Sequence, residues 1–222
     1  MNPAASLIVF DLDGTLIDSR RDLADAANAL IVERGGAPLA VDDITKMVGE
    51  GAALLVRRAL RAARIERDDL DAALARFLEL YDERLLVHTR LYDGTREMLE
   101  TLGPRATLAV LTNKPQRPTE DILAGLEIAS FFTRVVGGDT SFGRKPDPSG
   151  LNDLMRSTGV PAAETMMVGD SAIDLRTARA AGVRCCLVRY GFGFPTAEPE
   201  LAGDELIADM PADLVALVAP RR

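Results

Sequence analysis

The sequence predicts an α/β protein in which a doubly wound parallel sheet carries an inserted layer of helices. Short aliphatic runs recur at wide intervals along the 222 residues, and segments with helical periodicity separate the later runs. Between the first and second runs lies a gap of about 90 residues, far longer than the structureless loops that compact domains contain. The alternation of strands and helices predicts the sheet, and the long gap predicts the helical insertion.

The predicted strands are runs of consecutive aliphatic or β-branched residues, a composition typical of parallel strands that are buried on both faces. The first run is followed directly by two acidic residues, Asp11 and Asp13. In chain order the strands are Leu7–Phe10, Thr107–Leu111, Arg134–Val136, Met166–Gly169 and Cys185–Val188.

Helical segments lie between the later strands. They are Gln116–Leu126, Ser149–Thr158 and Ile173–Ala181, and Gly182 closes the last of them as a C-cap. A final short helix is expected from Pro211 to Val218, because proline is favoured in the first turn of a helix.

The gap after the first strand has helical rather than strand periodicity. We therefore expect a four-helix cap that is entered near residues 17–19 and left near residues 89–93. This division places residues 1–17 and 90–222 in the α/β core and residues 18–89 in the cap. The expected cap helices are Arg20–Arg34, Val41–Met47, Gly51–Ala63 and Asp68–Leu86.

Composition and charge narrow the class of protein. The chain has 47% hydrophobic and 27% charged residues, as ordinary globular proteins do, and no apolar run approaches the ~18 residues that a membrane span needs. Its formal charge of −8 disfavours a nucleic-acid partner, which requires a basic face. The N-terminal segment MNPAAS lacks the pattern of a secretory signal, so we expect a cytoplasmic location with Cys185 and Cys186 reduced.

Polar side chains follow several predicted strands at their carboxyl ends, where open α/β sheets bind ligands. Each alone is explained by a turn, a helix cap or a solvated position. Together they would bring three carboxylates, a hydroxyl, an amide and an ammonium to one edge of the sheet, which indicates a bound cation. Hard oxygen ligands with room for water suit Mg²⁺. These residues are Asp11, Asp13, Thr112, Asn113, Lys145 and Asp170, and Ser171 follows the last of them.

Four segments in this order resemble the four motifs of the haloacid dehalogenase superfamily: DLDGTL, LTNK, KPDP and VGDSAID. The resemblance covers nearly the whole chain, and it includes a helical cap after the first motif. It extends to the phosphoglycolate phosphatase branch through MVGEGAALLVRRAL, VLTNKP, VVGGDTSFGRKPDP and ARAAGV. It implies Mg²⁺-dependent hydrolysis of a phosphomonoester through an aspartyl-phosphate intermediate.

The resemblance also implies the metal and catalytic residues. Asp11 would be both nucleophile and metal ligand, Asp170 the second carboxylate ligand, and the backbone carbonyl of Asp13 a third ligand. The Asp13 side chain would protonate the leaving alkoxide and later accept a proton from the attacking water. Thr112 would be catalytic through its hold on the transferring phosphoryl oxygens, as would Lys145, which offsets their negative charge together with the metal.

Other residues would support this centre. The Asn113 amide would bind the phosphoryl group, and Gly14 would let the backbone turn tightly beside it. Ser171 and Asp174 would orient Lys145 and the metal-bound waters. The segment YGFGFP, residues 190–195, is expected to be a loop near the rim of the site.

Substrate choice is expected to reside in the cap. Gly49 and Gly51 in the segment VGEGA would let a loop or a helix N-terminus approach a small anion through free backbone amides. Arg57 and Arg58 follow on the next helix, and Arg58 is the candidate for binding a substrate carboxylate. A solvated surface position is the alternative for either arginine.

The leading prediction is a Mg²⁺-dependent phosphatase for a small phosphorylated metabolite, with 2-phosphoglycolate first among substrates. A broad sugar-phosphate phosphatase, a pyrophosphatase and a β-phosphoglucomutase-like mutase stay open as alternatives. From another class, a non-catalytic module could sense phosphate or metal through the same pocket, but such a module would be expected to lack Asp11 or Asp13. We expect a monomer or homodimer without nucleic-acid or membrane partners.

Overall fold

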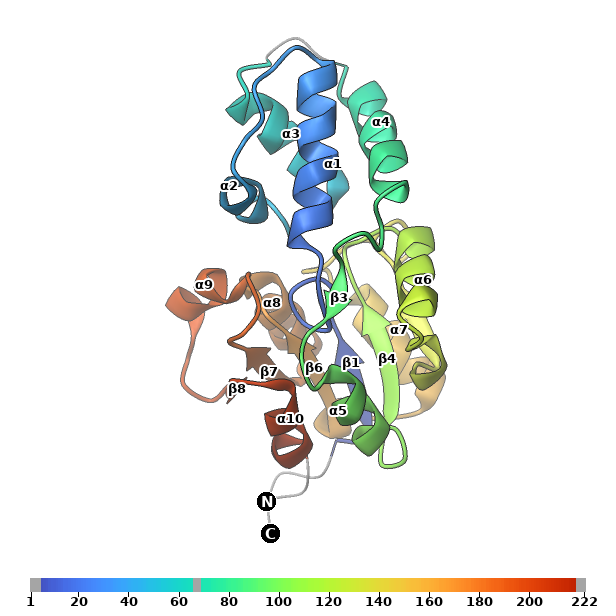
Figure 1. Ribbon diagram of the computed structural model, residues 1–222. Coiled ribbons are helices and arrows are strands. Elements are labelled where there is room, and N and C mark those ends of the chain that lie inside the picture. Colours follow the sequence, from blue (N-terminus) through green and yellow to red (C-terminus); the bar gives the residue numbers. More distant parts are fainter. Residues whose placement is uncertain (1–4, 66–68, 219–222) are drawn as a thin grey trace.

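A computed structural model describes residues 5–65 and 69–218 and contains a six-stranded parallel sheet (Figure 1). The strand order is β5-β4-β1-β6-β7-β8. The central strand β1 has Phe10 opposite Val110 on one side and Val168 on the other. The predicted α/β class and parallel sheet are therefore confirmed. The strands are β1 (Leu7–Phe10), β4 (Thr107–Leu111), β5 (Arg134–Val136), β6 (Thr165–Gly169), β7 (Arg184–Val188) and β8 (Leu206–Ala208).

Helices cover both faces of this sheet. Successive side chains along a strand point to opposite faces, and on β1 both sets are apolar and buried. Ile8 and Phe10 belong to one buried apolar cluster, and Leu7 and Val9 belong to another on the opposite face. This is the doubly wound arrangement that the sequence predicts. The first face is covered by α5 (Thr95–Leu102), α6 (Gln116–Gly125) and α10 (Pro211–Leu217), and the second by α7 (Ser149–Thr158), α8 (Ala172–Ala181) and α9 (Phe194–Ala197).

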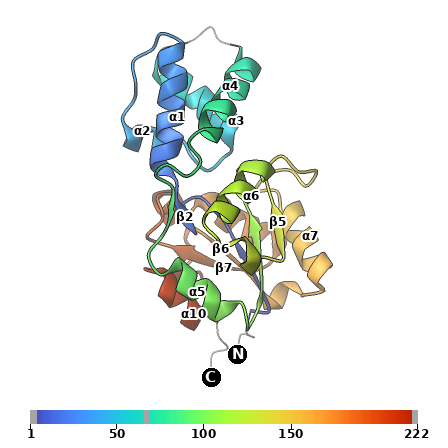
Figure 2. The same ribbon diagram turned by 45° about the vertical axis from the view of Figure 1, so that its right-hand side comes forward.

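Four further helices, here called the cap, form a separate layer beyond the sheet (Figures 1 and 2). They lie between two short strands, β2 (Ile17–Asp18) and β3 (Arg90–Leu91), which pair antiparallel. Their apolar faces meet in a third buried cluster that includes Phe77 and Tyr81. The predicted domain limits at residues 18 and 89 stay a prediction. The cap helices are α1 (Arg20–Glu33), α2 (Val41–Thr45), α3 (Ala52–Ala62) and α4 (Leu70–Asp82).

The last cap helix is shorter than the expected Asp68–Leu86, whose first residue lies outside the described part of the chain. Its start is set by Asp69, whose side chain accepts hydrogen bonds from the backbone N–H groups of Asp71 and Ala72 and so caps α4. Several short elements were not expected from the sequence: β2, β3, β8, α5 and α9.

A buried carboxylate holds the chain where it leaves the cap. Asp22 on α1 accepts hydrogen bonds from the backbone N–H groups of His88 and Thr89 and from the Thr89 hydroxyl, at 2.7–3.0 Å. The two connections between cap and sheet are therefore fixed against each other. Within the described residues, no helix combines the length and the apolar character needed to cross a bilayer.

Candidate active site

The carboxyl ends of three neighbouring strands bring predicted site residues to one edge of the sheet. Asp11, Thr112 and Asp170 directly follow β1, β4 and β6, which are adjacent in the strand order. Lys145 reaches the same place from the loop after β5, and its Nζ atom lies 2.8 Å from Oδ1 of Asp11. All four side chains are buried. The structure thus gathers residues that are up to 159 positions apart in the chain, from Asp11 to Asp170.

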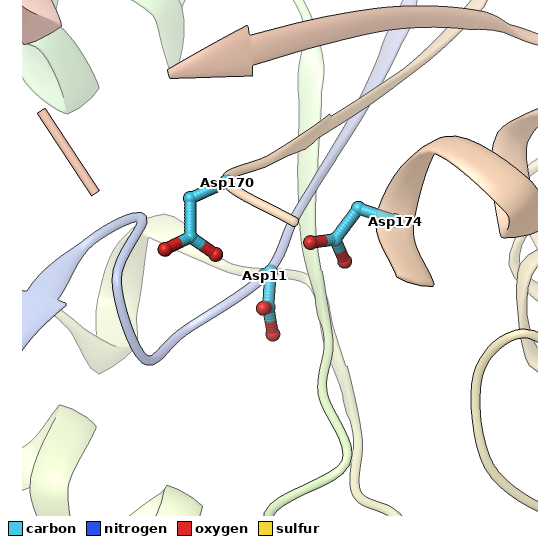
Figure 3. Close-up of side chains that lie close together, drawn as sticks. All are labelled: Asp11, Asp170 and Asp174. Atoms are coloured by element: carbon cyan, nitrogen blue, oxygen red, sulfur yellow. The ribbon is translucent and has the colours of Figure 1, made fainter. Parts of the chain in front are cut away.

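Asp11, Asp170 and Asp174 form the acidic cluster of the site (Figure 3). Each offers a carboxylate oxygen, and these three oxygens lie within 4.8 Å of one another. The sequence predicts Asp11, Asp13 and Asp170 as metal ligands, with Asp13 contributing its backbone carbonyl. Asp174, which lies in the first turn of α8, joins the cluster, whereas the carboxylate of Asp13 lies beside Lys114.

Burial of this cluster disfavours its negative charge. Burial raises the pKa of Asp11 to about 6, with Lys145 opposing the rise and Asp174 adding to it. Burial also raises the pKa of Asp170 well above its usual range, and the neighbouring carboxylates of Asp174 and Asp11 add to the effect. A cation of high charge reduces the repulsion between carboxylates in a desolvated site. Three hard oxygen donors at this spacing fit a divalent metal ion.

Backbone geometry fixes the position of Asp170. Gly14 has a φ of +85°, and a Cβ atom at this position would lie 2.0 Å from Oδ2 of Asp170. On another side, the backbone N–H of Gly193 donates a 2.7 Å hydrogen bond to the same oxygen. The loop at residues 190–193 therefore contacts the site, whereas Phe194 and Pro195 of the expected loop begin α9. Gly14 is needed here both for its positive φ and for the space beside the carboxylate.

Lys145 is shared between two carboxylates. Besides its contact with Asp11, its Nζ atom donates a 2.6 Å hydrogen bond to Oδ1 of Asp174. Burial alone would lower the pKa of Lys145, but Asp11 and Asp174 raise it above its usual value, so the ammonium stays charged. The other oxygen of Asp174 accepts hydrogen bonds from the backbone N–H and the hydroxyl of Ser171. Ser171 and Asp174 are thus placed where they can orient Lys145.

Asp13 lies between a hydroxyl and an ammonium. The Ser19 hydroxyl donates a hydrogen bond to Oδ1, and Nζ of Lys114 lies 3.0 Å from Oδ2. Lys114 in turn donates a 2.8 Å hydrogen bond to the hydroxyl of Tyr81 on α4, and its Nζ atom lies 4.6 Å from the centre of that ring. Burial raises the pKa of Tyr81 to about 12, so the phenol is protonated at neutral pH.

Sequence reasoning did not assign a role to Lys114 or Tyr81. Lys114 belongs to the LTNK segment that follows a predicted strand, so its position could have indicated a residue of the site. Tyr81 gave no such signal, because an aromatic residue on the apolar face of a helix indicates a core position.

Asn113 makes contacts other than those expected. Its Nδ2 atom donates hydrogen bonds of 3.0 Å to the backbone carbonyls of Gly49 and Lys145, so both amide hydrogens have acceptors within the protein. Its Oδ1 atom is buried and has no hydrogen-bond partner among the described residues. The hydroxyl of Thr112 accepts a 3.2 Å hydrogen bond from the backbone N–H of Lys114. Binding of phosphoryl oxygens by Thr112 and Asn113 stays a prediction.

A cleft lies between the cap and the edge of the sheet, and Thr112, Asn113 and Lys114 line it. Its polar wall includes Asp11, Asp13 and Asp170, and its cap wall is largely apolar. A ligand in this cleft would contact a cluster of charges at one end and hydrocarbon along its sides. The residues that line it from the cap are Leu23, Val48, Gly49, Gly51, Ala52, Leu55, Phe77, Leu78 and Tyr81.

The predicted specificity residues of the cap fall into two groups. Gly49 and Gly51 line the cleft, with φ values of +117° and +93°, and Gly51 precedes α3 without any side-chain cap. Arg58 does not line it, because its guanidinium pairs with Glu50 at 2.5 Å and contacts the Met47 carbonyl. In this arrangement the first turn of α3, rather than Arg58, faces the cleft.

The site can support nucleophilic attack by a carboxylate. Asp11 lies beside the Lys145 ammonium and beside carboxylates that could hold a divalent metal ion. The ammonium and the metal ion together would offset the negative charge of an incoming anion. Asp13 is a second carboxylate in the same cleft, held by two hydrogen-bond donors. A nucleophile together with a separate proton carrier is the arrangement needed to cleave an ester and then hydrolyse a covalent intermediate.

Comparisons with known proteins agree on one family. The family model described as haloacid dehalogenase-like hydrolase matches residues 8–188. The phosphoglycolate phosphatase of Pseudomonas syringae pv. tomato is 40% identical over 210 residues, which cover 90% of this chain and 76% of that protein. The phosphoglycolate phosphatase of Rhodospirillum rubrum is 45% identical over 192 residues, covering 83% and 80%.

Solved structures show the same architecture. A crystal structure from Haemophilus somnus 129PT, described as a predicted phosphoglycolate phosphatase, superposes with a TM-score of 0.89 at 30% identity. The superposition covers 96% of this chain and 97% of that one, so it includes both the sheet and the cap helices.

Proposed function

Because the chain belongs to the haloacid dehalogenase-like hydrolase family, we propose that it is a Mg²⁺-dependent phosphatase whose principal substrate is 2-phosphoglycolate. The observation that carries the reaction type is the contact of Asp11 with Lys145 at 2.8 Å inside the acidic cluster. A buried carboxylate beside an ammonium and a set of metal donors is suited to attack a dianionic phosphoryl group.

In the first half-reaction, a carboxylate oxygen of Asp11 forms a bond to phosphorus while the bond from phosphorus to the ester oxygen breaks. Asp13 gives its proton to that oxygen, so the product leaves as an alcohol and the enzyme holds an aspartyl phosphate. In the second half-reaction, water attacks phosphorus, Asp13 takes a proton from it, and inorganic phosphate leaves with Asp11 restored.

Mg²⁺ would be held by the carboxylates of Asp11 and Asp170 and by the backbone carbonyl of Asp13, and it would supply positive charge beside the phosphoryl group. Asp174 lies within the same cluster but also binds Lys145. We assign it to holding the ammonium in place, with Ser171 fixing its other oxygen. Lys145 then neutralises the phosphoryl oxygens, and Thr112 orients them with its hydroxyl.

Three observations support a small anionic substrate. The relatives that cover most of this chain are named phosphoglycolate phosphatases. The cap wall of the cleft is mostly apolar, which offers few partners to the hydroxyls of a sugar. The first turn of α3, with Gly51 before it, presents backbone amides of the kind that bind carboxylates. A sugar-phosphate phosphatase, a pyrophosphatase and a mutase are the competing activities, and the cytoplasm stays the expected location.

The decisive experiment measures phosphate release from 2-phosphoglycolate, several sugar phosphates and pyrophosphate, with Mg²⁺ and with chelator. We expect kcat/KM for 2-phosphoglycolate to exceed that of the other compounds by orders of magnitude and to need Mg²⁺. A flat profile would keep the phosphatase and remove the named substrate. Absence of release from every compound would favour a mutase or a non-catalytic binding module.

A further inference from the structure

Two consecutive residues, Asn113 and Lys114, contact the cap on one side and the proposed catalytic residues on the other. Asn113 donates one amide hydrogen to the carbonyl of Gly49 in the cap and the other to the carbonyl of Lys145. Lys114 donates to the Tyr81 hydroxyl on α4 and pairs with Asp13. We call Asn113 and Lys114 the cap bridge. No other role has been assigned to Lys114.

The contacts of the cap bridge are buried and well defined. Both Asn113 and Lys114 are at most 6% exposed. Burial alone would lower the pKa of Lys114, but Asp13 and Tyr81 raise it above its usual value, so a full positive charge lies within the cleft. A buried ammonium must keep its partners, because loss of one leaves part of the charge without compensation. The position of Lys114 therefore depends on both Asp13 and Tyr81.

The two cap contacts come from different cap elements. Gly49 lies in the loop between α2 and α3, whereas Tyr81 lies at the end of α4, packed parallel to Phe77 with ring centres 6.0 Å apart. Only a cap that is seated on the sheet edge places the Gly49 carbonyl and the Tyr81 hydroxyl within reach of adjacent residues. The bridge therefore has two separate contacts that both require the same cap position.

We propose that Asn113 and Lys114 are positioning residues that make the geometry of the two proposed catalytic side chains depend on the seating of the cap. With the cap seated, Tyr81 holds Lys114 against Asp13, and Gly49 holds Asn113 against the backbone of Lys145. When the cap moves away, each bridge residue loses one of its hydrogen-bond partners, so Lys114 holds Asp13 less firmly and Asn113 holds the backbone of Lys145 less firmly. The bridge thereby links the position of Asp13 to the contacts that Tyr81 and Gly49 make from the cap.

The test is a double-mutant cycle with Tyr81→Phe and Lys114→Met, measured as kcat and KM on the best phosphomonoester. Tyr81→Phe removes a single hydroxyl and keeps the ring packed on Phe77. If Tyr81 acts through Lys114, kcat falls about ten-fold with KM nearly unchanged, and the double variant is no slower than Lys114→Met alone. Additive losses, an unchanged kcat, or a rise in KM alone would overturn the proposal.

Tyr92→Phe is the matched control. Tyr92 is also largely buried and packs on an aromatic ring, that of Tyr190, but its hydroxyl has no hydrogen-bond partner among the described residues. The same chemical change at Tyr92 should leave kcat within about two-fold of wild type, since a hydroxyl without a partner contributes little. Thermal unfolding of each variant verifies that the fold is retained.

The kinetic test rests on the proposed function, so a second measurement is independent of turnover. Hydrogen exchange is followed in the loop after β1, residues 11–19, and in the cap loop, residues 47–51. Tyr81→Phe should speed exchange in the first segment although the change lies in α4, and Asn113→Asp, which removes the amide donors, should speed it in the second. If the wild type releases no phosphate, the proposed function fails, and the cap bridge is then tested by hydrogen exchange alone. Unchanged exchange in both segments of these variants would overturn the cap bridge.

Discussion

The Nζ atom of Lys145 lies 2.8 Å from Oδ1 of Asp11 and 2.6 Å from Oδ1 of Asp174, so one buried ammonium is shared by two carboxylates. Removing the partner of a buried charge is usually destabilising, because the remaining charge is left without compensation. Here Asp174 keeps Lys145 paired when Asp11 is replaced. The proposed nucleophile can therefore be changed with little damage to its surroundings, and its chemistry can be tested apart from stability.

For Asp11→Asn we expect turnover to fall by at least ~10³-fold, because an amide cannot form the covalent intermediate. The melting temperature should be unchanged or higher. Burial raises the pKa of Asp11 to about 6, so the ionised carboxylate is unfavourable in the fold above that pH, and the neutral amide avoids this cost. Steady-state kinetics and thermal unfolding at pH 7.5 test both statements. Asp25→Asn, which removes a charge on α1, should keep turnover; wild-type turnover in Asp11→Asn would exclude the assigned role.

For Asp13→Ala the loss should depend on the leaving group. A poor leaving group such as the glycolate alkoxide needs a proton from Asp13, so its transfer should slow by about 10²–10⁴-fold. With p-nitrophenyl phosphate the leaving phenolate needs little protonation, so transfer to Asp11 should continue while hydrolysis of the phosphoenzyme is slow. Acid-quench measurement of the phosphoenzyme should show that it accumulates. If the rate of phosphoryl transfer to Asp11 fell equally for both substrates, the acid and base role of Asp13 would be contradicted.

For Gly14→Ala we expect loss of metal affinity beyond the cost in stability. A Cβ atom at residue 14 would lie 2.0 Å from Oδ2 of Asp170, so this carboxylate must move. Gly35→Ala is the matched control, since Gly35 has a similar φ of +80° and no atom within 4 Å of the added carbon. Both changes should cost about 1 kcal/mol of unfolding free energy from the positive φ. Only Gly14→Ala should weaken Mg²⁺ binding, by ten-fold or more on titration calorimetry; equal affinities in the two variants would contradict the prediction.

The sheet and the acidic residues could be predicted because their signals are local. The run from Leu7 to Phe10 is apolar throughout and is followed directly by Asp11, so strand and site residue are adjacent in the sequence. Helix α8 was also recognisable, since Ser171 and Asp174 form a capping box at its start and Gly182 ends it with a φ of +67°.

Elements and contacts without local signals were missed. Helix α5 is preceded by Gly94 in a left-handed conformation, without a side-chain cap, and has only eight residues. The two-residue strands β2 and β3 are too short to show alternation. The contacts of Lys114 with Tyr81 and of Asn113 with Gly49 span 33 and 64 positions and depend on how the cap lies on the sheet. Such packing is a property of the whole fold, so no pattern near either residue indicates it.

The loop before β8 should make stability depend on pH at acidic values. The carboxylate of Glu205 accepts hydrogen bonds from the backbone N–H groups of Ala202 and Gly203 and from Arg179, and the side chain is 5% exposed. Burial alone would raise the pKa of Glu205, but these donors lower it to about 2. An unfolded chain has a glutamate pKa of ~4.3, so the contribution of Glu205 is complete above about pH 5. It is lost as the pH falls toward 2, where the folded protein also takes up the proton.

Glu205→Gln tests this dependence by urea unfolding between pH 3 and pH 7. At pH 7 the variant should be less stable by about 1 kcal/mol, a moderate value because the donors on Ala202, Gly203 and Arg179 are exposed to water. The difference between variant and wild type should shrink as the pH falls below 5, since wild-type Glu205 then loses its advantage. Glu100→Gln removes the same charge from an exposed side chain that bonds none of the described residues, and it should show no such trend. A Glu205→Gln deficit that stays constant down to pH 3 would mean that packing, rather than the charged hydrogen bonds, is the source of the stability.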